Sequence, residues 1–376
     1  MIKFWNYTRE YKKIRKEILD KLDKTIIKGN IFFGAELDNF EKKFIKRYKS
    51  KFGVAVGSGT DALLISLKAI NIRNGDEIIT AANTAIPTIS AIVNSGAKPK
   101  LVDVGEDYLI DTSKIERLIT KKTKAIIPVH LYGQACDMFK IRSIAKKYKL
   151  KIIEDCAQSQ GAKYQDKFVG TFGDFGCFSF YPTKILGAYG DGGFITTNSY
   201  KDYLKIKRLR FYGIETIDKK NLFYNKYYAN ENGLNSRLDE IQSSILNIKL
   251  RYVDKFINKR IKLANLYFKY LKNTNIKLPK VSKFKKHVFH LFTVSHPKKE
   301  KIVRMLEKKK IGTRVIYPYP INVMKGYKKY KFNNRNLGYS KKLSKEIFSL
   351  PLYPELKNNE VKKICISLIK ILEKVN

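Results

Sequence analysis

Cysteine is scarce in this chain of 376 residues. The four cysteines stand far apart and none of them forms a C-x-x-C pair; they are Cys136, Cys156, Cys177 and Cys365. This pattern fits neither a disulfide framework nor a zinc site, and it suits a reducing compartment. We therefore expect a cytoplasmic protein that holds no metal.

Long apolar runs are missing as well. No stretch approaches the roughly 18 or more apolar residues that a membrane span needs, and the N-terminal segment MIKFWN meets a charged residue before an apolar run of the secretory type develops. Hydrophobic residues nevertheless make up 44% of the chain and aromatic residues 12%, so a sizeable core can form and disorder is not expected. The sequence predicts no membrane partner.

Acidic side chains are few, with 34 Asp and Glu against 76 Lys and Arg, and the formal net charge is +42. Clustered lysines would favour a nucleic acid or an anionic membrane as partner. The lysines are instead spread over nearly every helical segment, as with Lys12, Lys16 and Lys21. No helix-turn-helix, zinc-finger or RNA-recognition signature accompanies them. The composition thus indicates a solvated basic surface that steers anionic substrates and disfavours a nucleic-acid-binding protein.

Short β-branched runs alternate with helical patterns in the first part of the chain. The strand-like segments are residues 53–56, 77–82, 100–104, 124–129, 151–154 and 194–197, and the helical patterns are residues 60–70, 86–93, 112–119 and 138–148. Such alternation predicts an α/β fold with a mainly parallel central sheet and helices on both faces.

The pattern changes towards the C-terminus. It is almost continuously helical at residues 236–271, and then strands at 288–294 and 314–317 mix with helices at 299–309 and 359–373. We predict a large α/β domain over residues 1–250 and a smaller α+β domain over residues 251–376.

The segment Gly57-Ser58-Gly59-Thr60-Asp61 lies between a predicted strand and a predicted helix. Small residues there permit close approach of the backbone, and the N–H groups at a helix start favour an anion such as a phosphate. Ser58 or Thr60 could add a hydroxyl donor. An ordinary helix cap explains the same residues, and this segment alone favours the cap.

Asp155 follows an apolar strand within Glu154-Asp155-Cys156-Ala157-Gln158. The carboxyl end of a central parallel strand is where α/β sheets bind ligands. A carboxylate at this place could pair with the pyridinium nitrogen of a cofactor and increase its capacity to accept electrons. A helix cap or a surface acid is an equal alternative on this segment alone.

Lys184 ends the aromatic segment 178–184, FSFYPTK, and the glycine-rich segment 186–193 follows it. A lysine in a less polar pocket has a lowered pKa and becomes nucleophilic, as Schiff-base chemistry requires. Most lysines of this chain are expected to be solvated. The unusual glycine- and aromatic-rich surroundings favour a functional role for Lys184.

Taken in order, these segments resemble the DegT/DnrJ/EryC1/StrS family of fold-type-I, pyridoxal-phosphate-dependent aminotransferases, which act on nucleotide-linked keto-sugars. The resemblance extends over nearly the whole chain. The matching segments are IFFGAE (31–36), GSGTDAL (57–63), VHLYGQ (129–134), EDCAQ (154–158), SFYPTK (179–184), LNSRLDEIQ (234–242), HVFHLF (287–292) and YPYPI (317–321).

The resemblance implies a role for each matching site residue. Lys184 would hold pyridoxal 5'-phosphate as a Schiff base, Asp155 would pair with the pyridine nitrogen, and Gln158 would lie against the ring. The phosphate would be held by residues of two segments, namely Ser58, Gly59, Thr60 and Ser179. Asn235 would reach the phosphate bound in a neighbouring subunit, so the active site would require a homodimer.

Two positions depart from the family pattern. Ala85 stands where many members carry an aromatic ring over the cofactor, which bears on stacking. Asn322 stands where the family usually has a histidine near the sugar nucleotide, which bears on substrate affinity and identity. Lys184 itself favours transamination, because related sugar dehydratases replace this lysine with histidine.

The reaction implied is transfer of an amino group from L-glutamate to a nucleotide-linked keto-deoxysugar, with dTDP as the expected nucleotide and C3 favoured over C4. Two alternatives stay open. One is a transaminase of the family that acts on a cyclitol or another non-nucleotide ketone. The other is a non-catalytic member that serves as a regulator or scaffold.

Overall fold

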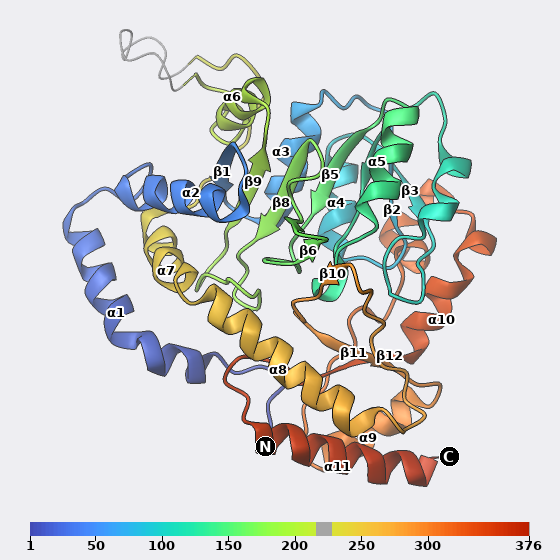
Figure 1. Cartoon of the computed structure of the whole chain (residues 1–376). Coiled ribbons are helices and arrows are strands. Elements are labelled where there is room, and N and C mark those ends of the chain that lie inside the picture. Colours follow the sequence, from blue (N-terminus) through green and yellow to red (C-terminus); the bar gives the residue numbers. More distant parts are fainter. Residues whose placement is uncertain (216–227, 376) are drawn as a thin grey trace.

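The computed structural model describes residues 1–215 and 228–375, and a seven-stranded sheet lies at its centre (Figure 1). The strands follow the order β1-β9-β8-β5-β4-β2-β3 across the sheet. Their bounds are β1 (Phe52–Val56), β2 (Glu77–Ala81), β3 (Lys98–Val102), β4 (Thr123–Ile127), β5 (Lys151–Asp155), β8 (Phe175–Ser179) and β9 (Gly193–Thr197). Within this sheet β9 runs antiparallel to both neighbours, and the pairs from β8 to β3 are parallel. The predicted mainly parallel sheet is confirmed.

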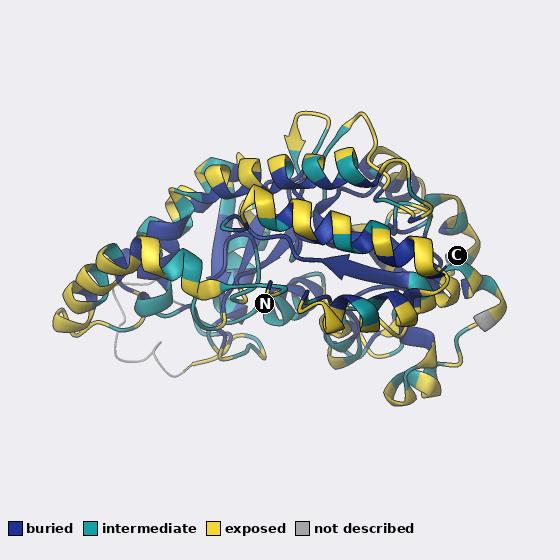
Figure 2. Ribbon diagram, turned by 90° about the horizontal axis from the view of Figure 1, so that it is seen from below, coloured by how far each residue is buried: buried dark blue, intermediate teal, exposed yellow. Residues whose placement is uncertain are grey.

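Consecutive residues on the central strands pack into different apolar clusters. Ile78 on β2 and Ile127 on β4 join one cluster, whereas Ile79 and Ile126 join another. Because side chains alternate along a strand, the sheet is buried on both faces, as the dark interior of Figure 2 shows. The first face is covered by α3 (Gly59–Ala69), α4 (Ile86–Asn94) and α6 (Tyr200–Leu209), and the second by α2 (Ala35–Tyr48) and α5 (Met138–Lys147).

A smaller C-terminal domain surrounds a separate apolar cluster. It contains α8 (Val253–Leu271), β11 (Phe292–Ser295), α9 (Lys299–Lys308), β12 (Ile347–Leu350) and α11 (Asn358–Val375), whereas α10 (Gly338–Glu346) packs against the central sheet through Leu343. The N-terminal Ile2 joins the same cluster, so the chain begins beside this domain (Figure 1). The remaining elements are α1 (Tyr7–Ile27), α7 (Glu240–Leu250) and a small sheet of β6 (Lys163–Tyr164), β7 (Lys167–Phe168) and β10 (Lys285–Lys286). The domain boundary at residue 250 stays a prediction.

Several predicted elements are wrong in detail. The helix predicted at residues 236–271 is two helices, because the chain turns at Arg251 and Tyr252 between α7 and α8. The helix predicted at 112–119 is two short 3-10 turns, because Ile119 is extended and ends the run. Residues 288–291 are not strand, since Phe289 has a left-handed backbone with φ 48°. Residues 314–317 contribute a single bridge from Arg314 to Ser349.

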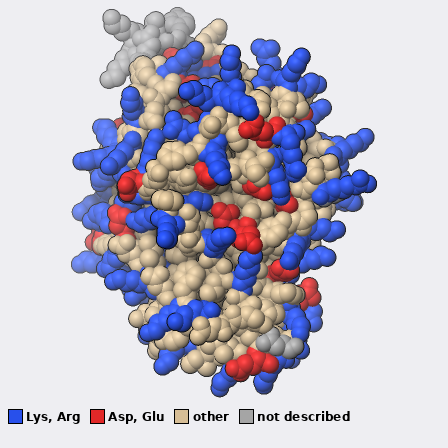
Figure 3. Space-filling view, turned by 45° about the vertical axis from the view of Figure 1, so that its right-hand side comes forward, with Lys and Arg blue, Asp and Glu red and all other residues tan. Residues whose placement is uncertain are grey.

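Lysine and arginine side chains are spread over the face drawn in Figure 3, with acidic side chains among them. This distribution agrees with the dispersed basic surface that the sequence predicts. Among the described residues, none of the helices combines the length and the apolar character that crossing a lipid bilayer requires.

Glu240 joins α7 to the start of α2. Its buried carboxylate accepts hydrogen bonds from the backbone N–H groups of Gly34 (3.0 Å), Glu36 (2.9 Å) and Leu37 (3.0 Å). These donors belong to the first turn of α2 and its cap, where a helix leaves N–H groups without intrahelical partners.

We predict that Glu240→Ala lowers the free energy of unfolding by about 2–4 kcal/mol, because three buried donors lose their acceptor. Urea denaturation followed by circular dichroism measures this change. The matched control Glu373→Ala removes an exposed carboxylate of α11 and should change stability by less than about 0.5 kcal/mol. Equal effects of the two substitutions would contradict the prediction.

Candidate active site

The carboxyl ends of two neighbouring parallel strands define the site. β5 ends at Asp155 and β8 ends at Ser179, and the two strands pair in parallel with Asp155 opposite Cys177. Parallel strands end at the same edge of a sheet, so Asp155, Ser179 and the following Lys184 emerge together. The charges of Asp155 and Lys184 are close enough to shift each other's pKa.

The Asp155 carboxylate is buried and held in place by two donors. Thr88 Oγ1 donates to Oδ2 at 2.8 Å, and the Ala157 N–H donates to Oδ1 at 3.1 Å. Burial raises the pKa of the carboxyl, while the bonds from Ala157 and Thr88 and the charge of Lys184 act in the opposite direction. Thr88 is a site residue that the sequence did not reveal, because it lies on α4, far from Asp155 along the chain.

Lys184 lies in the turn after β8, where its backbone N–H donates to Tyr181 O at 2.8 Å. Its side chain is half-buried, and within residues 1–215 and 228–375 its Nζ has no hydrogen bond or salt bridge. Burial lowers the pKa of the Lys184 amine to about 8, and the nearby Asp155 charge acts against this shift. The amine is therefore substantially neutral in mildly alkaline solution, as a nucleophile requires.

The start of α3 meets the end of β8 through Gly59. A Cβ at this position would lie 2.7 Å from Ser179 Cβ, so only glycine permits the close approach. Ser58 caps α3 by accepting from Asp61 N at 3.1 Å, which confirms the cap interpretation of this hydroxyl. The N–H groups of Gly59 and Thr60 belong to the first turn of α3, where an anion can bind. Capping and anion binding are thus compatible here.

Gln158 is buried and fixed from two sides. Its Oε1 accepts from Tyr132 N at 2.9 Å, and its Nε2 donates to Tyr317 Oη at 2.9 Å. Tyr132 Oη in turn donates to Ile316 O. The segments 129–134 and 317–321 therefore meet at Gln158, and this fixes the orientation of its side-chain amide.

Asn235 lies next to the segment that starts α3. It is exposed, and its backbone forms a bridge with Phe211. The next residue, Ser236, accepts from Gly57 N at 2.9 Å and donates to Asp61 Oδ2 at 2.7 Å. Asn235 is thus held at the surface beside the 57–61 segment.

The two positions that depart from the family pattern lie on segments that are hydrogen-bonded to each other just after β2. Ala85 immediately precedes α4, and Asn322 is buried in a 3-10 turn (Ile321–Val323). Ile321 N donates to Ala82 O at 3.0 Å, which ties this turn to the segment that leads to Ala85.

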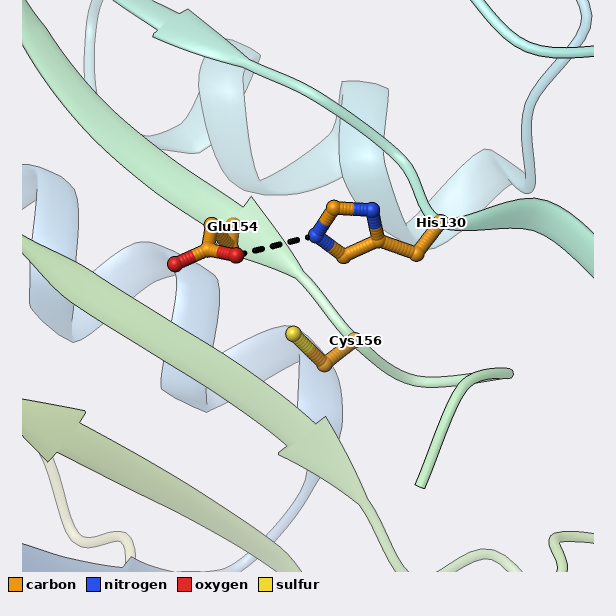
Figure 4. Close-up of side chains that lie close together, drawn as sticks. All are labelled: His130, Glu154 and Cys156. Atoms are coloured by element: carbon orange, nitrogen blue, oxygen red, sulfur yellow. Dashed lines mark hydrogen bonds and ion pairs between the residues drawn. The ribbon is translucent and has the colours of Figure 1, made fainter. Parts of the chain in front are cut away.

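His130, Glu154 and Cys156 lie close together, as Figure 4 shows, at distances that could suit a metal ion. The donors and acceptors of His130 and Glu154 are already used. His130 Nδ1 accepts from Cys136 N at 2.9 Å, so the ring hydrogen is on Nε2 and is donated to Glu154 Oε2 at 3.0 Å. Glu154 also accepts from the N–H groups of Gly170, Phe172 and Gly173 at 2.7–2.8 Å. This cluster stabilises the fold and offers no vacant ligand set.

Comparison with known proteins agrees with this geometry. The sequence profile described as the DegT/DnrJ/EryC1/StrS aminotransferase family matches residues 12–369. The chain belongs to this family.

Two named relatives and one solved structure illustrate the similarity. The chain is 39% identical, over 94% of each sequence, to the dTDP-3-amino-3,4,6-trideoxy-alpha-D-glucose transaminase of Micromonospora megalomicea subsp. nigra. It is 41% identical, over 97% of this chain and 98% of the relative, to the dTDP-3-amino-3,6-dideoxy-alpha-D-galactopyranose transaminase of Aneurinibacillus thermoaerophilus. The crystal structure of DesV from S. venezuelae superposes with a TM-score of 0.94 at 32% identity, covering 100% of this chain and 99% of that one.

Membership in this family confirms the predicted fold type, the enzyme class and the dependence on pyridoxal phosphate. The residues present fit this cofactor. The first turn of α3 offers N–H groups to a phosphate, the buried Asp155 offers a carboxylate to a ring nitrogen, and Lys184 offers an amine to an aldehyde. Gly59 is essential to the fit, because a side chain there would push α3 away from Ser179.

We predict that the rate at which the cofactor-free protein takes up pyridoxal phosphate rises with pH and has a midpoint at about 8, the pKa of Lys184. The neutral amine, which dominates above the pKa, is the reactive form. Absorbance of the bound cofactor after rapid mixing at several pH values measures this rate, with Lys184→Ala as the control for binding without covalent attachment. A midpoint near 10, the value of an ordinary lysine, would contradict the buried-amine account.

Proposed function

We propose that this enzyme transfers an amino group from L-glutamate to the keto group of a nucleotide-linked deoxysugar, with dTDP as nucleotide and C3 as the carbon that receives the amine. The observation that carries the proposal is the Lys184 amine, unpaired among the described residues and with its pKa lowered to about 8, next to the buried Asp155 carboxylate. Two relatives of 39% and 41% identity are named as dTDP-3-amino-sugar transaminases, which supports both dTDP and C3.

Pyridoxal phosphate, when bound, supplies an electron sink and carries the amino group between two half-reactions. Lys184 Nζ would attach the cofactor and then act as the proton carrier. It takes the proton from Cα of L-glutamate in the first half-reaction, and it delivers a proton to the sugar carbon that receives the amine in the second. The low pKa of Lys184 suits both directions of proton transfer.

Other residues would hold the cofactor and fix its orientation. Asp155, fixed by Thr88 and Ala157, would keep a negative charge next to the ring nitrogen. Gln158, fixed by Tyr132 and Tyr317, would lie against the ring. The phosphate would be bound where α3 meets β8, by Ser58, Gly59, Thr60 and Ser179.

We predict that the purified holoenzyme shows a visible band of bound cofactor, which bleaches when L-glutamate is added and returns when a dTDP-linked 3-keto-sugar is added. Lys184→Ala should lack the covalent band and lose at least about a thousandfold in turnover, since it has neither the attachment point nor the proton carrier. Absorbance spectroscopy follows both half-reactions separately.

The acceptor panel separates the alternatives. Recovery of the band with a 3-keto-sugar but not a 4-keto-sugar supports C3. Recovery only with a cyclitol ketone would replace the nucleotide-sugar proposal. This outcome is included because Asn322 stands where the family usually has a histidine near the sugar nucleotide. If the protein binds no cofactor, a regulatory or scaffold role would replace the proposal of catalysis.

We further propose a homodimer in the cytoplasm with shared active sites, in which Asn235 reaches the phosphate bound by the partner. Asn235 is exposed, and its neighbour Ser236 is hydrogen-bonded to Gly57 and Asp61. An apolar surface surrounds this region: Phe32 and Phe33 are 40% and 39% exposed, and Arg237 packs on the Phe32 ring at 4.1 Å. Exposed aromatic surface of this kind is typical of an interface.

Subunit complementation tests the shared site. Lys184→Ala and Asn235→Asp should each be inactive alone, the second because its charge repels the cofactor phosphate. Mixing the two after reversible dissociation should restore about a quarter of wild-type activity, because each mixed dimer then has one site with both native residues. Two variants that stay inactive when mixed, although native mass spectrometry detects mixed dimers, would refute the shared site.

A further inference from the structure

A groove of about 650 Å³ lies where α5 leads into β5, at the end of that strand remote from Asp155 (Figure 1). About 13 Å of strand separates Lys151, at the start of β5, from Asp155 at its end. We call this groove the basal groove and define it by its charged lining residues, namely Arg142, Lys146, Lys149, Lys151 and Asp174. None of the roles proposed above uses these five residues.

The charges that line the basal groove are out of balance. Asp174 is the single acid among the described lining residues; its Oδ1 pairs with Lys151 Nζ at 2.6 Å, and its Oδ2 accepts from Ile152 N at 2.9 Å. The other cations are exposed, and within residues 1–215 and 228–375 their side chains form no salt bridge or hydrogen bond; they are Arg142, Lys146 and Lys149. The carboxylate therefore neutralises Lys151 alone, and the remaining cations are available to a ligand.

The end of α5 does not account for these cations. Lysine and arginine near a helix C-terminus often compensate backbone carbonyls that have no partner. Here the last-turn carbonyls of Ile144, Ala145 and Lys146 accept backbone N–H groups at 3.0, 2.8 and 3.3 Å. The carbonyls are already satisfied, so they do not require the side chains of Arg142 and Lys146.

Repulsion between cations extends to a lysine beside the groove. Lys167 Nζ lies 4.8 Å from the ring centre of Phe172, which lines the groove. Desolvation lowers the pKa of Lys167, the charge of Arg142 acts in the same direction, and the charge of Glu154 acts against both. A like charge that shifts a pKa in this way is an unfavourable contact, which a bound anion would relieve.

The floor of the groove is fixed before any ligand binds. The N–H groups of Phe172 and Gly173 donate to Glu154 Oε1 at 2.7 and 2.8 Å. A Cβ on Gly173 would lie 2.6 Å from Ile152 O, so glycine permits this loop to lie directly against β5. A preformed floor reduces the entropic cost of binding a ligand.

We propose that the basal groove binds a diphosphate group, whose oxygens pair with Arg142, Lys146 and Lys149. One guanidinium and two ammonium groups match two linked phosphates, whereas a single carboxylate would leave part of the positive charge unpaired. Free diphosphate and the diphosphate of a nucleoside diphosphate share this chemistry. The site would be independent of the proposed reaction, because it lies at the opposite end of β5 from Asp155.

Protection of lysines from acetylation tests the site in the holoenzyme. Inorganic diphosphate, at an ionic strength held constant with NaCl, should slow the labelling of Lys146 and Lys149 at least about fivefold, because a paired ammonium is less often neutral. Mass spectrometry of the labelled peptides measures both rates. The exposed Lys363 on α11 lies outside the groove and serves as the control in the same sample, with an unchanged rate.

A double variant, Arg142→Gln with Lys146→Gln, tests the pairing. The diphosphate concentration that half-protects Lys149 should rise at least about tenfold, because charge-assisted bonds are lost. The matched control, Lys363→Gln with Lys370→Gln, removes the same net charge from exposed positions of α11 and should leave this concentration within about twofold. All four substituted side chains are exposed, so circular dichroism and the rate of bleaching by L-glutamate should match the wild type.

A parallel titration with dTDP distinguishes the two sources of the ligand. Half-protection of Lys149 at the same concentration of dTDP and of inorganic diphosphate would show that the diphosphate alone is recognised. Half-protection by dTDP at a concentration about tenfold lower would assign the groove to a nucleoside diphosphate. Both results support the proposal.

Three results would overturn the proposal. The first is labelling of Lys146 and Lys149 that neither inorganic diphosphate nor dTDP slows. The second is a double variant in which half-protection of Lys149 stays within about twofold of the wild type. The third is duplex DNA that protects these lysines while diphosphate does not, which would assign the groove to a nucleic acid.

Discussion

The structure depends on a carboxylate that takes no part in the proposed chemistry. Glu154 is fully buried and accepts four hydrogen bonds, one from His130 and three from the loop of residues 170–173. These bonds attach the end of β5 to the segment that leads into β8. Because consecutive side chains on a strand point to opposite faces, fixing Glu154 on one face fixes Asp155 on the other. The Asp155 carboxylate, which is proposed to pair with the cofactor, is thus oriented by the neighbouring Glu154.

The same edge of the sheet brings the remaining parts of the site together. β8 ends beside β5, so the turn after β8 places Lys184 close to Asp155, and Gly59 lets the start of α3 contact Ser179. The N-terminal segment and the smaller domain then close the space next to Thr183. One strand pair therefore positions an amine, a carboxylate and the start of α3.

Local sequence patterns predicted most of the fold and the candidate side chains of the site. The elements and residues that they failed to predict have physical explanations. Buried strands read as apolar runs, and Lys184 was found because its surroundings are unlike those of the solvated lysines. The turn at Arg251 and Tyr252 was missed because an apolar face can continue across a break between two helices. Thr88 and Tyr317 were missed because their place in the site comes from tertiary contacts with distant segments. Roles assigned by family resemblance, such as that of Asn235, depend on a second copy of the chain.

In a chain rich in lysine, one amine, that of Lys184, is proposed to hold the cofactor. Borohydride reduction of the holoenzyme fixes the cofactor to the amine that carries it, and proteolysis with mass spectrometry then locates the label. We predict a single labelled peptide that contains Lys184, and loss of this label when L-glutamate is added before reduction. A label on a different lysine, or labels distributed over many surface lysines, would contradict the account.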